Sequence, residues 1–304
     1  MAYIAHLLNM TAIYVILGIS LNLLFGYAEL FSVCHAIFYG IGAYAVALLT
    51  VKFGTNFFLA VIAGVVLAGI MGAIISIPSI RVKAEYLMLV TFGFQMVVYT
   101  VFVLWVSLTR GPSGIPGIPR LSFFGYTFFS RYSFLPFSWS FAALCFFVAW
   151  RVINSPFGRV LRANREDELA TQALGKNVRR FKVQVFVLSS AMAALGGCLL
   201  APYITFVGPE YFTLHTSITL ILLVILGGLG NLWGSVVGAV IVVLLPEILR
   251  FVALPAAVAN PLRMVLYSGL LVLCLMFRPQ GIIPERPTRE ESLESSNISS
   301  GVRE

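Results

Sequence analysis

The sequence predicts an all-α polytopic membrane protein, a bundle of transmembrane helices, and three observations carry that prediction. Hydrophobic residues make up 60% of the chain, and only 11% of the residues are charged. The mean hydropathy is +0.96. The apolar residues also gather in runs close to the length of about 20 residues that a helix needs to span a bilayer. This composition excludes a water-soluble globular protein.

Nine such runs are expected to be membrane spans, and together they make one transmembrane domain over residues 1–283. After it, residues 284–304 are rich in Glu, Ser and Arg and almost free of apolar side chains, which predicts a disordered tail. The net charge of +8 is explained by basic residues at the membrane edges and by anionic lipid, so we expect no nucleic acid partner. The expected spans, in chain order, are residues 5–25, 30–50, 57–78, 85–108, 134–152, 183–203, 213–229, 233–252 and 262–277.

Basic residues between the spans predict their direction, because Lys and Arg are enriched in cytoplasmic loops. Arg81 and Lys83 lie between the third and fourth spans, and the charged stretch 154–182 lies between the fifth and sixth. Further arginines follow the last span. An even number of spans separates each pair of these regions, so all three fit on the cytoplasmic side. This predicts a cytoplasmic C-terminus and, with nine spans, an external N-terminus.

The first two spans are separated by a short break at residues 25–29 that has two interpretations. It is either a cytoplasmic turn or an unwound segment at membrane depth. Non-helical backbone at that depth requires cover from protein or from a water-filled cavity. The sequence leaves both interpretations open.

The charged stretch 154–182 is expected to form two short helices in water. Ser155 followed by Pro156 is typical of a helix N-cap and first position. Asn164 is predicted to cap a second helix, and Gly175 to end it in a left-handed conformation. The first turn of that second helix would carry three acids, favourable beside the positive end of the helix dipole. Such a compact element offers another protein a surface to hold. The three acids are Glu166, Asp167 and Glu168.

The chain contains no constellation of residues that predicts catalysis or a metal site. The four cysteines fall singly inside apolar stretches and read as small hydrophobic residues. The glycine-rich run 227–235 lacks the Gly-Lys-Ser/Thr of a nucleotide-binding loop. No charged residue occupies the middle of a confident span, so the energy for any transport is expected to come from another subunit. The uncharged midspan residues either join helices or line a passage, and the candidates for a passage are Asn22, Ser32, His35, Thr91 and Gln95.

Several stretches resemble the LivM-type permease of branched-chain amino acid ATP-binding cassette (ABC) importers. The run SPFGRVLRANREDELATQALG at residues 155–175 resembles the cytoplasmic coupling loop of that family. Residues 227–235 and the run FRPQGI at 277–282 are similar to two further motifs of the family. Residues 26–44 resemble another, with departures at Glu29 and Cys34. The loop TRGPSGIPGIP at residues 109–119 resembles a family turn, with Arg110 where a glycine is usual.

The resemblance implies roles and partners that the residue pattern alone does not give. It implies a bacterial inner-membrane permease with a bundle like that of vitamin B12 and siderophore permeases. Its partners would be a LivH-like second permease subunit, two ABC ATPase subunits, a periplasmic or lipid-anchored binding protein, and membrane lipid. ATP would be bound by the ATPase subunits, and this chain would bind no cofactor. The implied coupling residues are Arg159, Arg162, Arg165, Glu166, Asp167, Glu168, Ala170 and Gly175. In the loop 109–119 the candidates for contact with a binding protein are Thr109, Gly111 and Gly114, and the alternative is that this loop forms only a stiff turn.

Three functions are consistent with these observations. The first is a translocation pathway for branched-chain amino acids driven by ATP hydrolysis on separate subunits. The second keeps the same machinery but takes urea, amides or aromatic acids. The third, of a different class, is an ATP-independent channel or carrier. In none of them is the chain itself an enzyme.

Overall fold

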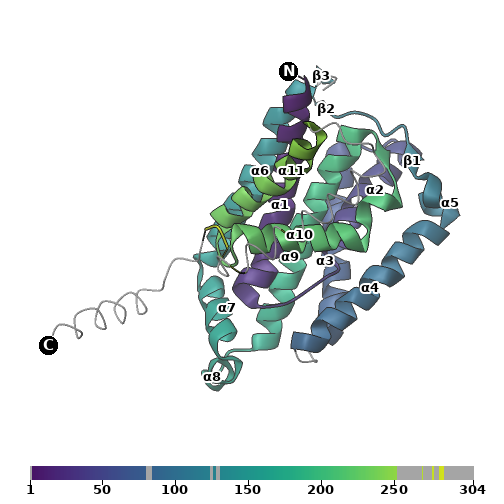
Figure 1. Cartoon of the computed structure of the whole chain (residues 1–304). Coiled ribbons are helices and arrows are strands. Elements are labelled where there is room, and N and C mark those ends of the chain that lie inside the picture. The colour runs from purple at the N-terminus through teal and green to yellow at the C-terminus, as the bar shows by residue number, and fades with distance from the viewer. Residues whose placement is uncertain are drawn as a thin grey trace.

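The structure, a computed structural model, describes residues 2–79, 84–123, 126–127, 131–251, 269, 276 and 281–283. Within these ranges six helices are long and apolar enough to cross a membrane, and they correspond to the first six expected spans. The all-α bundle is thereby confirmed for this part of the chain (Figure 1). The six helices are α1 (Ala2–Ala28), α2 (His35–Phe53), α3 (Phe57–Ser79), α4 (Ala84–Leu104), α6 (Arg131–Ile153) and α9 (Val178–Ile204).

The seventh expected span is a shorter helix than the sequence suggests. Helix α10 (Leu214–Gly227) has 14 residues, so its length is about 21 Å against a hydrocarbon thickness of about 30 Å. Figure 1 shows α10 lying across the long helices. The structure therefore shortens the expected span 213–229 to a 14-residue apolar helix, below the length of a full membrane crossing. The eighth expected span is α11 (Leu232–Phe251). The ninth, 262–277, lies outside the described residues except at the single positions 269 and 276, and Arg81, Lys83 and the tail 284–304 lie outside them entirely.

Helix α9 lies at the centre of the bundle and packs against α1, α2 and α3. Glycines allow the closest of these approaches. A Cβ atom on Gly42 of α2 would lie within 3.0 Å of the backbone of Ala194, and one on Gly197 would lie equally close to the backbone of Tyr39. Small residues at such contacts let two helix backbones meet, which is how membrane helices gain packing energy when lipid is as apolar as their side chains.

The break between the first two spans lies later than the predicted 25–29, because residues 25–28 are still helical, and it is a largely buried, non-helical segment at 29–34. Helix α1 continues to Ala28, and α2 begins only at His35, so the second expected span starts five residues late. Within the segment Leu30, Ser32 and Val33 are buried, and the Val33 amide donates to the Thr91 hydroxyl of α4 at 3.1 Å. Protein covers this backbone, which favours the unwound segment over the exposed turn. In Figure 1 it is the purple trace that leaves the lower end of α1.

The glycine- and proline-rich loop after α4 is joined to the segment before α10 by a short pair of antiparallel strands. The fourth span breaks at Trp105, and α5 (Val106–Thr109) and a 3₁₀ turn, η1 (Gly111–Ser113), follow. Strand β1 (Ile115–Pro116) pairs antiparallel with β4 (Phe206–Val207), and a second 3₁₀ turn, η2 (Pro209–Phe212), leads into α10. Two further strands of two residues each, β2 (Ser122–Phe123) and β3 (Tyr126–Thr127), pair antiparallel before α6.

Candidate functional site

The charged stretch after α6 folds into two short helices, α7 (Pro156–Glu166) and α8 (Glu168–Ala173), as the sequence predicts. Ser155 caps α7, accepting a hydrogen bond from the Gly158 amide at 3.4 Å, and Pro156 occupies the first turn. The predicted cap of the second helix is wrong. Asp167 caps α8, accepting from the Ala170 amide at 3.0 Å. Asn164 lies inside α7 instead, because its buried side chain shares the packed face with Leu161, one turn earlier.

The end of α8 follows the predicted left-handed stop. Gly175 has φ +75°, a backbone conformation that costs a glycine little, and its amide donates to the Gln172 carbonyl at 2.9 Å. Asn177 then caps α9, accepting from the Arg180 amide at 3.3 Å. The chain therefore turns back into the membrane immediately after α8, and α8 becomes the tip of the loop.

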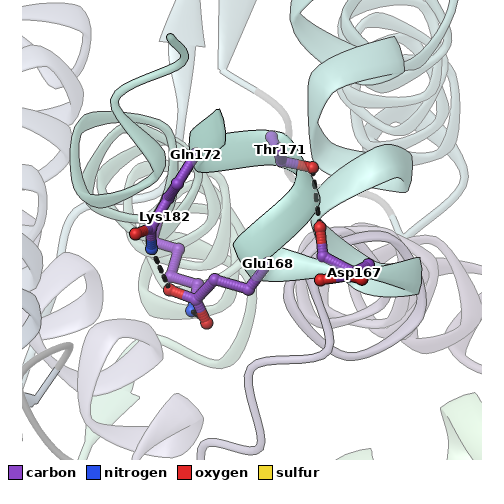
Figure 2. Close-up of polar contacts among 5 residues, drawn as sticks. All are labelled: Asp167, Glu168, Thr171, Gln172 and Lys182. Atoms are coloured by element: carbon purple, nitrogen blue, oxygen red, sulfur yellow. Dashed lines mark hydrogen bonds and ion pairs between the residues drawn. The ribbon is translucent and has the colours of Figure 1, made fainter. Parts of the chain in front are cut away.

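Helix α8 presents an apolar surface on a firmly held backbone. Leu169 and Leu174 are 77% and 79% exposed. On the other side the Thr171 hydroxyl donates to the Asp167 carbonyl at 2.8 Å. Lys182 of α9 donates to Glu168 at 2.7 Å, so α8 is also tied to the next membrane helix (Figure 2). Two exposed leucines on a helix this short are the arrangement expected of a docking surface.

The three arginines of α7 divide into two groups. Arg159 is exposed, as a docking residue would be. Arg162 and Arg165 are half-buried and bind within the chain. The Arg162 guanidinium donates to the carbonyl of Ile153, the last residue of α6, at 3.3 Å. That of Arg165 donates to the Gly26 carbonyl, near the end of α1, at 2.7 Å. Sequence reasoning grouped all three as candidate coupling residues and did not separate these two roles.

Asn22, a candidate for a passage, is engaged with the turn between α10 and α11. Its side-chain amide donates to the Asn231 carbonyl and to the Ser235 hydroxyl, both at 2.8 Å. Its side-chain oxygen accepts from the Gly230 amide at 3.0 Å. The side chain is fully buried. These contacts favour the interpretation in which Asn22 joins helices.

Gln95 of α4 has the same kind of environment. Its side-chain nitrogen donates to the Phe212 carbonyl at 3.0 Å, and its oxygen accepts from the Ser217 hydroxyl at 3.2 Å. Ser217 in turn accepts from the Ala36 amide at 3.0 Å, so α4, α10 and α2 meet here. Buried amides at membrane depth need such partners. A role for Gln95 in a passage stays a prediction.

The remaining passage candidates lie near the start of α2 and are also fully buried. His35 Nε2 lies 2.7 Å from the Ser20 hydroxyl of α1, and Ser32 Oγ lies 3.3 Å from Cys34 Sγ. Thr91 accepts from the amide of Val33 as described above. The structure thus brings Ser32, His35 and Thr91 to one region around the non-helical segment, whereas Asn22 lies apart, at the α10–α11 turn.

The three candidates in the loop after α4 fix the shape of that loop. The Thr109 hydroxyl donates to the Phe102 carbonyl at 2.8 Å and accepts from the Gly111 amide at 3.2 Å. Gly111 and Gly114 both have positive φ, +58° and +63°. A Cβ atom on Gly114 would lie within 3.0 Å of the Val207 carbonyl oxygen in β4. The interactions explain a stiff turn, and contact with a binding protein stays a prediction.

Sequence reasoning missed the partners of these side chains. Ser20, Ser217, Ser235 and Gly230 all take part in buried contacts between helices. Ser20 and Ser217 were not singled out, and Gly230 and Ser235 were noted only as members of the glycine-rich run 227–235. Their only sequence signal is that small polar residues sit inside apolar runs. Since the partners are more than a hundred residues apart in most cases, that signal does not say which helix each residue meets.

Replacing Asn22 with alanine is expected to lower the melting temperature of the detergent-purified protein by several degrees. The change leaves the Gly230 amide and the Asn231 carbonyl buried without this partner, and interhelical hydrogen bonds of this kind contribute about 0.6–2 kcal/mol in membrane proteins. Thermal unfolding followed by tryptophan fluorescence measures it. Thr100→Ala is the control, because the exposed Thr100 hydroxyl bonds only within its own helix, to Met96. Equal melting temperatures for the two variants would contradict the assignment.

Comparison with known proteins identifies the family. The family model of the permease component of the branched-chain amino acid transport system matches residues 3–275. The high-affinity branched-chain amino acid transport system permease protein LivM of Escherichia coli is 33% identical over 299 residues, covering 91% of this chain and 69% of the relative.

A probable LivM permease of Methanocaldococcus jannaschii is 28% identical, covering 93% of this chain and 94% of the relative. The LivH permease protein of Escherichia coli is 30% identical over 129 residues, covering 42% of this chain and 40% of the relative. No solved structure matches the chain. The chain is thus a transport subunit without an ATPase domain. It belongs to the permease component family of branched-chain amino acid ABC transport systems and is similar to LivM permeases.

Proposed function

We propose that this chain forms the translocation pathway for branched-chain amino acids together with a second, LivH-like permease subunit. The observation that carries the proposal is the surface of α8, where Leu169 and the C-cap residue Leu174 are exposed and the first residue of the helix, Glu168, is paired with Lys182 of α9. Two ATPase subunits, one on each permease, would hold such surfaces. A periplasmic or lipid-anchored binding protein would deliver the substrate from outside.

The mechanism is alternating access driven from the cytoplasmic side. ATP binding closes the paired ATPases, and the movement is passed to the loop of α7 and α8. Apolar contacts through Leu169 and Leu174 give the docking its affinity. The exposed charges of Arg159 and Glu166 add orientation rather than affinity, because exposed ion pairs contribute only about 0–1 kcal/mol each, and Glu168 is already paired with Lys182.

Two observations support an external energy source over an ion-coupled carrier. Along the described parts of α1 to α4, α6 and α9, the charged side chains lie near the helix ends. Ion-coupled transporters place carboxylates or basic groups at the midplane, where the coupling ion binds. In addition, the relatives that align over more than nine tenths of this chain are named as permeases of branched-chain amino acid transport systems.

Reconstitution tests the proposal directly. The chain, a LivH-like subunit, the ATPases and the binding protein encoded beside it are placed in proteoliposomes, and uptake of labelled leucine is measured with ATP enclosed. We expect uptake only when both ATP and ATPases are present. Uptake by this chain alone would contradict the proposal and favour a channel or carrier. ATP-dependent uptake of urea or an aromatic acid in place of leucine would keep the machinery and change the substrate.

A further inference from the structure

The hydrogen bond from Arg165 to Gly26 gives a partner to a backbone carbonyl at the end of a membrane helix. Because α1 ends at Ala28, the carbonyls of its last turn have no partner within the helix. The Arg165 guanidinium donates to the Gly26 carbonyl at 2.7 Å. It thereby places a positive charge at the negative end of the α1 dipole, where such a charge is stabilising. The coupling loop is therefore joined to α1 by a charge-assisted hydrogen bond.

A second arginine makes the equivalent contact with a different helix. Arg162 donates to the carbonyl of Ile153, at which α6 ends. Arg162 and Arg165 are three residues apart, so they lie on the same side of α7. That side of α7 consequently joins the cytoplasmic ends of α6 and α1, while α8, beyond Asp167, carries the exposed leucines.

The end of α1 that Arg165 holds is also packed against the turn between α10 and α11. A Cβ atom on Gly26 would lie within 3.0 Å of the backbone of Gly230, so the two backbones are in direct contact. The Gly230 amide also donates to Asn22 of α1. The α10–α11 turn therefore has little room to move independently of the end of α1.

The same end of α1 leads directly into the buried non-helical segment 29–34. Glu29 at its start is exposed, and Val33 is hydrogen-bonded to Thr91 of α4. A movement of Gly26 would consequently displace the α10–α11 turn on one side, and segment 29–34 with its contact to α4 on the other. These are the elements in which the buried polar side chains of the bundle meet.

We propose that Arg165 is the positioning residue that passes movement of α8 to the end of α1, and through it to the α10–α11 turn and segment 29–34. The inference rests on the proposed function, because it requires an ATPase to move α8. Helices α7 and α8 are separated only by Asp167, which caps α8 and receives the Thr171 hydroxyl, so they are expected to move together. Helix α7 packs against α1, and the Arg165 side chain adds a hydrogen bond from that unit to the end of α1.

The experiment compares Arg165→Gln, Arg165→Lys and Arg151→Gln in the complete reconstituted complex. Leucine uptake and ATP hydrolysis are measured in the same vesicles, together with assembly and melting temperature. Arg165→Gln is expected to keep assembly and ATP hydrolysis but to lower the uptake per ATP by about tenfold, the upper range for coupling mutations. Arg165→Lys, with its charge but a single point of contact, should recover part of this loss. Arg151→Gln removes the same charge from the exposed last turn of α6 and should leave the ratio unchanged.

The outcomes separate this inference from the function on which it rests. A wild-type complex without ATP-driven uptake would overturn the proposed function, and the inference with it. A wild-type ratio of uptake to hydrolysis in Arg165→Gln would overturn the inference alone. So would a loss of uptake and hydrolysis in the same proportion with a lower melting temperature, since that result indicates a structural role.

A second measurement keeps Arg165 in place. A cysteine at the exposed position Glu29 is labelled with a maleimide, in a Cys274→Ser background, with and without a non-hydrolysable ATP analogue. Cys34, Cys145 and Cys198 are buried and should react slowly. We expect the labelling rate at position 29 to change when the analogue binds. An unchanged rate would show that movement does not reach the end of α1, and the inference would be wrong.

Discussion

Replacing both Leu169 and Leu174 with aspartate is expected to abolish ATP-driven uptake while the chain remains folded. The two side chains are 77% and 79% exposed, so their loss should change the free energy of unfolding by no more than about 0.5 kcal/mol. Apolar anchors at an interface contribute about 2 kcal/mol or more each. Losing both would weaken docking of the ATPase by about 4 kcal/mol, or roughly a thousandfold in affinity.

Co-purification of the ATPase subunits with the permease measures docking, and uptake of leucine measures its consequence. Ala163→Asp is the control, because it adds a negative charge at an exposed position of α7 away from the two leucines. The double variant should melt at the wild-type temperature and release the ATPases, while the control retains them. Full uptake by the double variant would mean that α8 is not the docking surface.

The largest effect on folding is expected from Gly42→Val. A Cβ atom at this position would lie within 3.0 Å of the backbone atoms of Ala194, so α2 and α9 would have to separate to admit the new side chain. Overpacking a well-filled core costs about 1–3 kcal/mol even where side chains can shift. Here the obstacle is backbone in the central helix of the bundle, and the cost should be at least at the top of that range.

The yield of monodisperse Gly42→Val protein after detergent extraction measures this effect. That yield should fall to near zero. Gly93→Val provides the matched comparison. It makes the same substitution in a membrane helix, but no other part of the described structure lies within 4 Å of the position where its Cβ would stand, apart from its own chain neighbours and helix backbone. We expect Gly93→Val to extract like the wild type. A well-folded Gly42→Val protein would show that the α2–α9 contact is looser than the structure indicates.

The long helices could be predicted because hydropathy depends only on the local sequence. A run of some 20 apolar residues has few alternatives to a membrane helix, since each backbone amide needs a partner within the same segment. The length of α10 could not be read in the same way. Residues 220–229 form an apolar run, but hydropathy does not report that Pro209 begins a 3₁₀ turn or that α10 then lies across the long helices (Figure 1).

In the loop of α7 and α8, some residue roles could likewise be predicted from the local sequence and others could not. Ser155, Pro156 and Gly175 act within one turn of themselves, so their roles as cap, first residue and stop follow from the local sequence. Asn164 has an equally good local pattern, but burial of its side chain on α7 decides against the cap, and burial depends on the whole fold.

The roles of the arginines depend on distant backbone. Arg165 binds a carbonyl 139 residues away in the chain, and Asn22 binds one 209 residues away. Nothing in the residues around Arg162 or Arg165 distinguishes them from Arg159. Only the arrangement of α1 and α6 does so, by placing two unpaired helix ends within reach.

The last described residues add a constraint on how the molecule is made. The amides of Ile282 and Ile283 donate to the carbonyls of Leu226 and Gly227, both at 3.0 Å, and so complete the end of α10. The ribosome delivers α1 first and residues 281–283 much later. A nascent chain already inserted in the bilayer must therefore hold those two carbonyls open until synthesis has passed Ile283. Premature termination before that point would leave the six long described helices complete in sequence, and yet the Leu226 and Gly227 carbonyls would lack these partners.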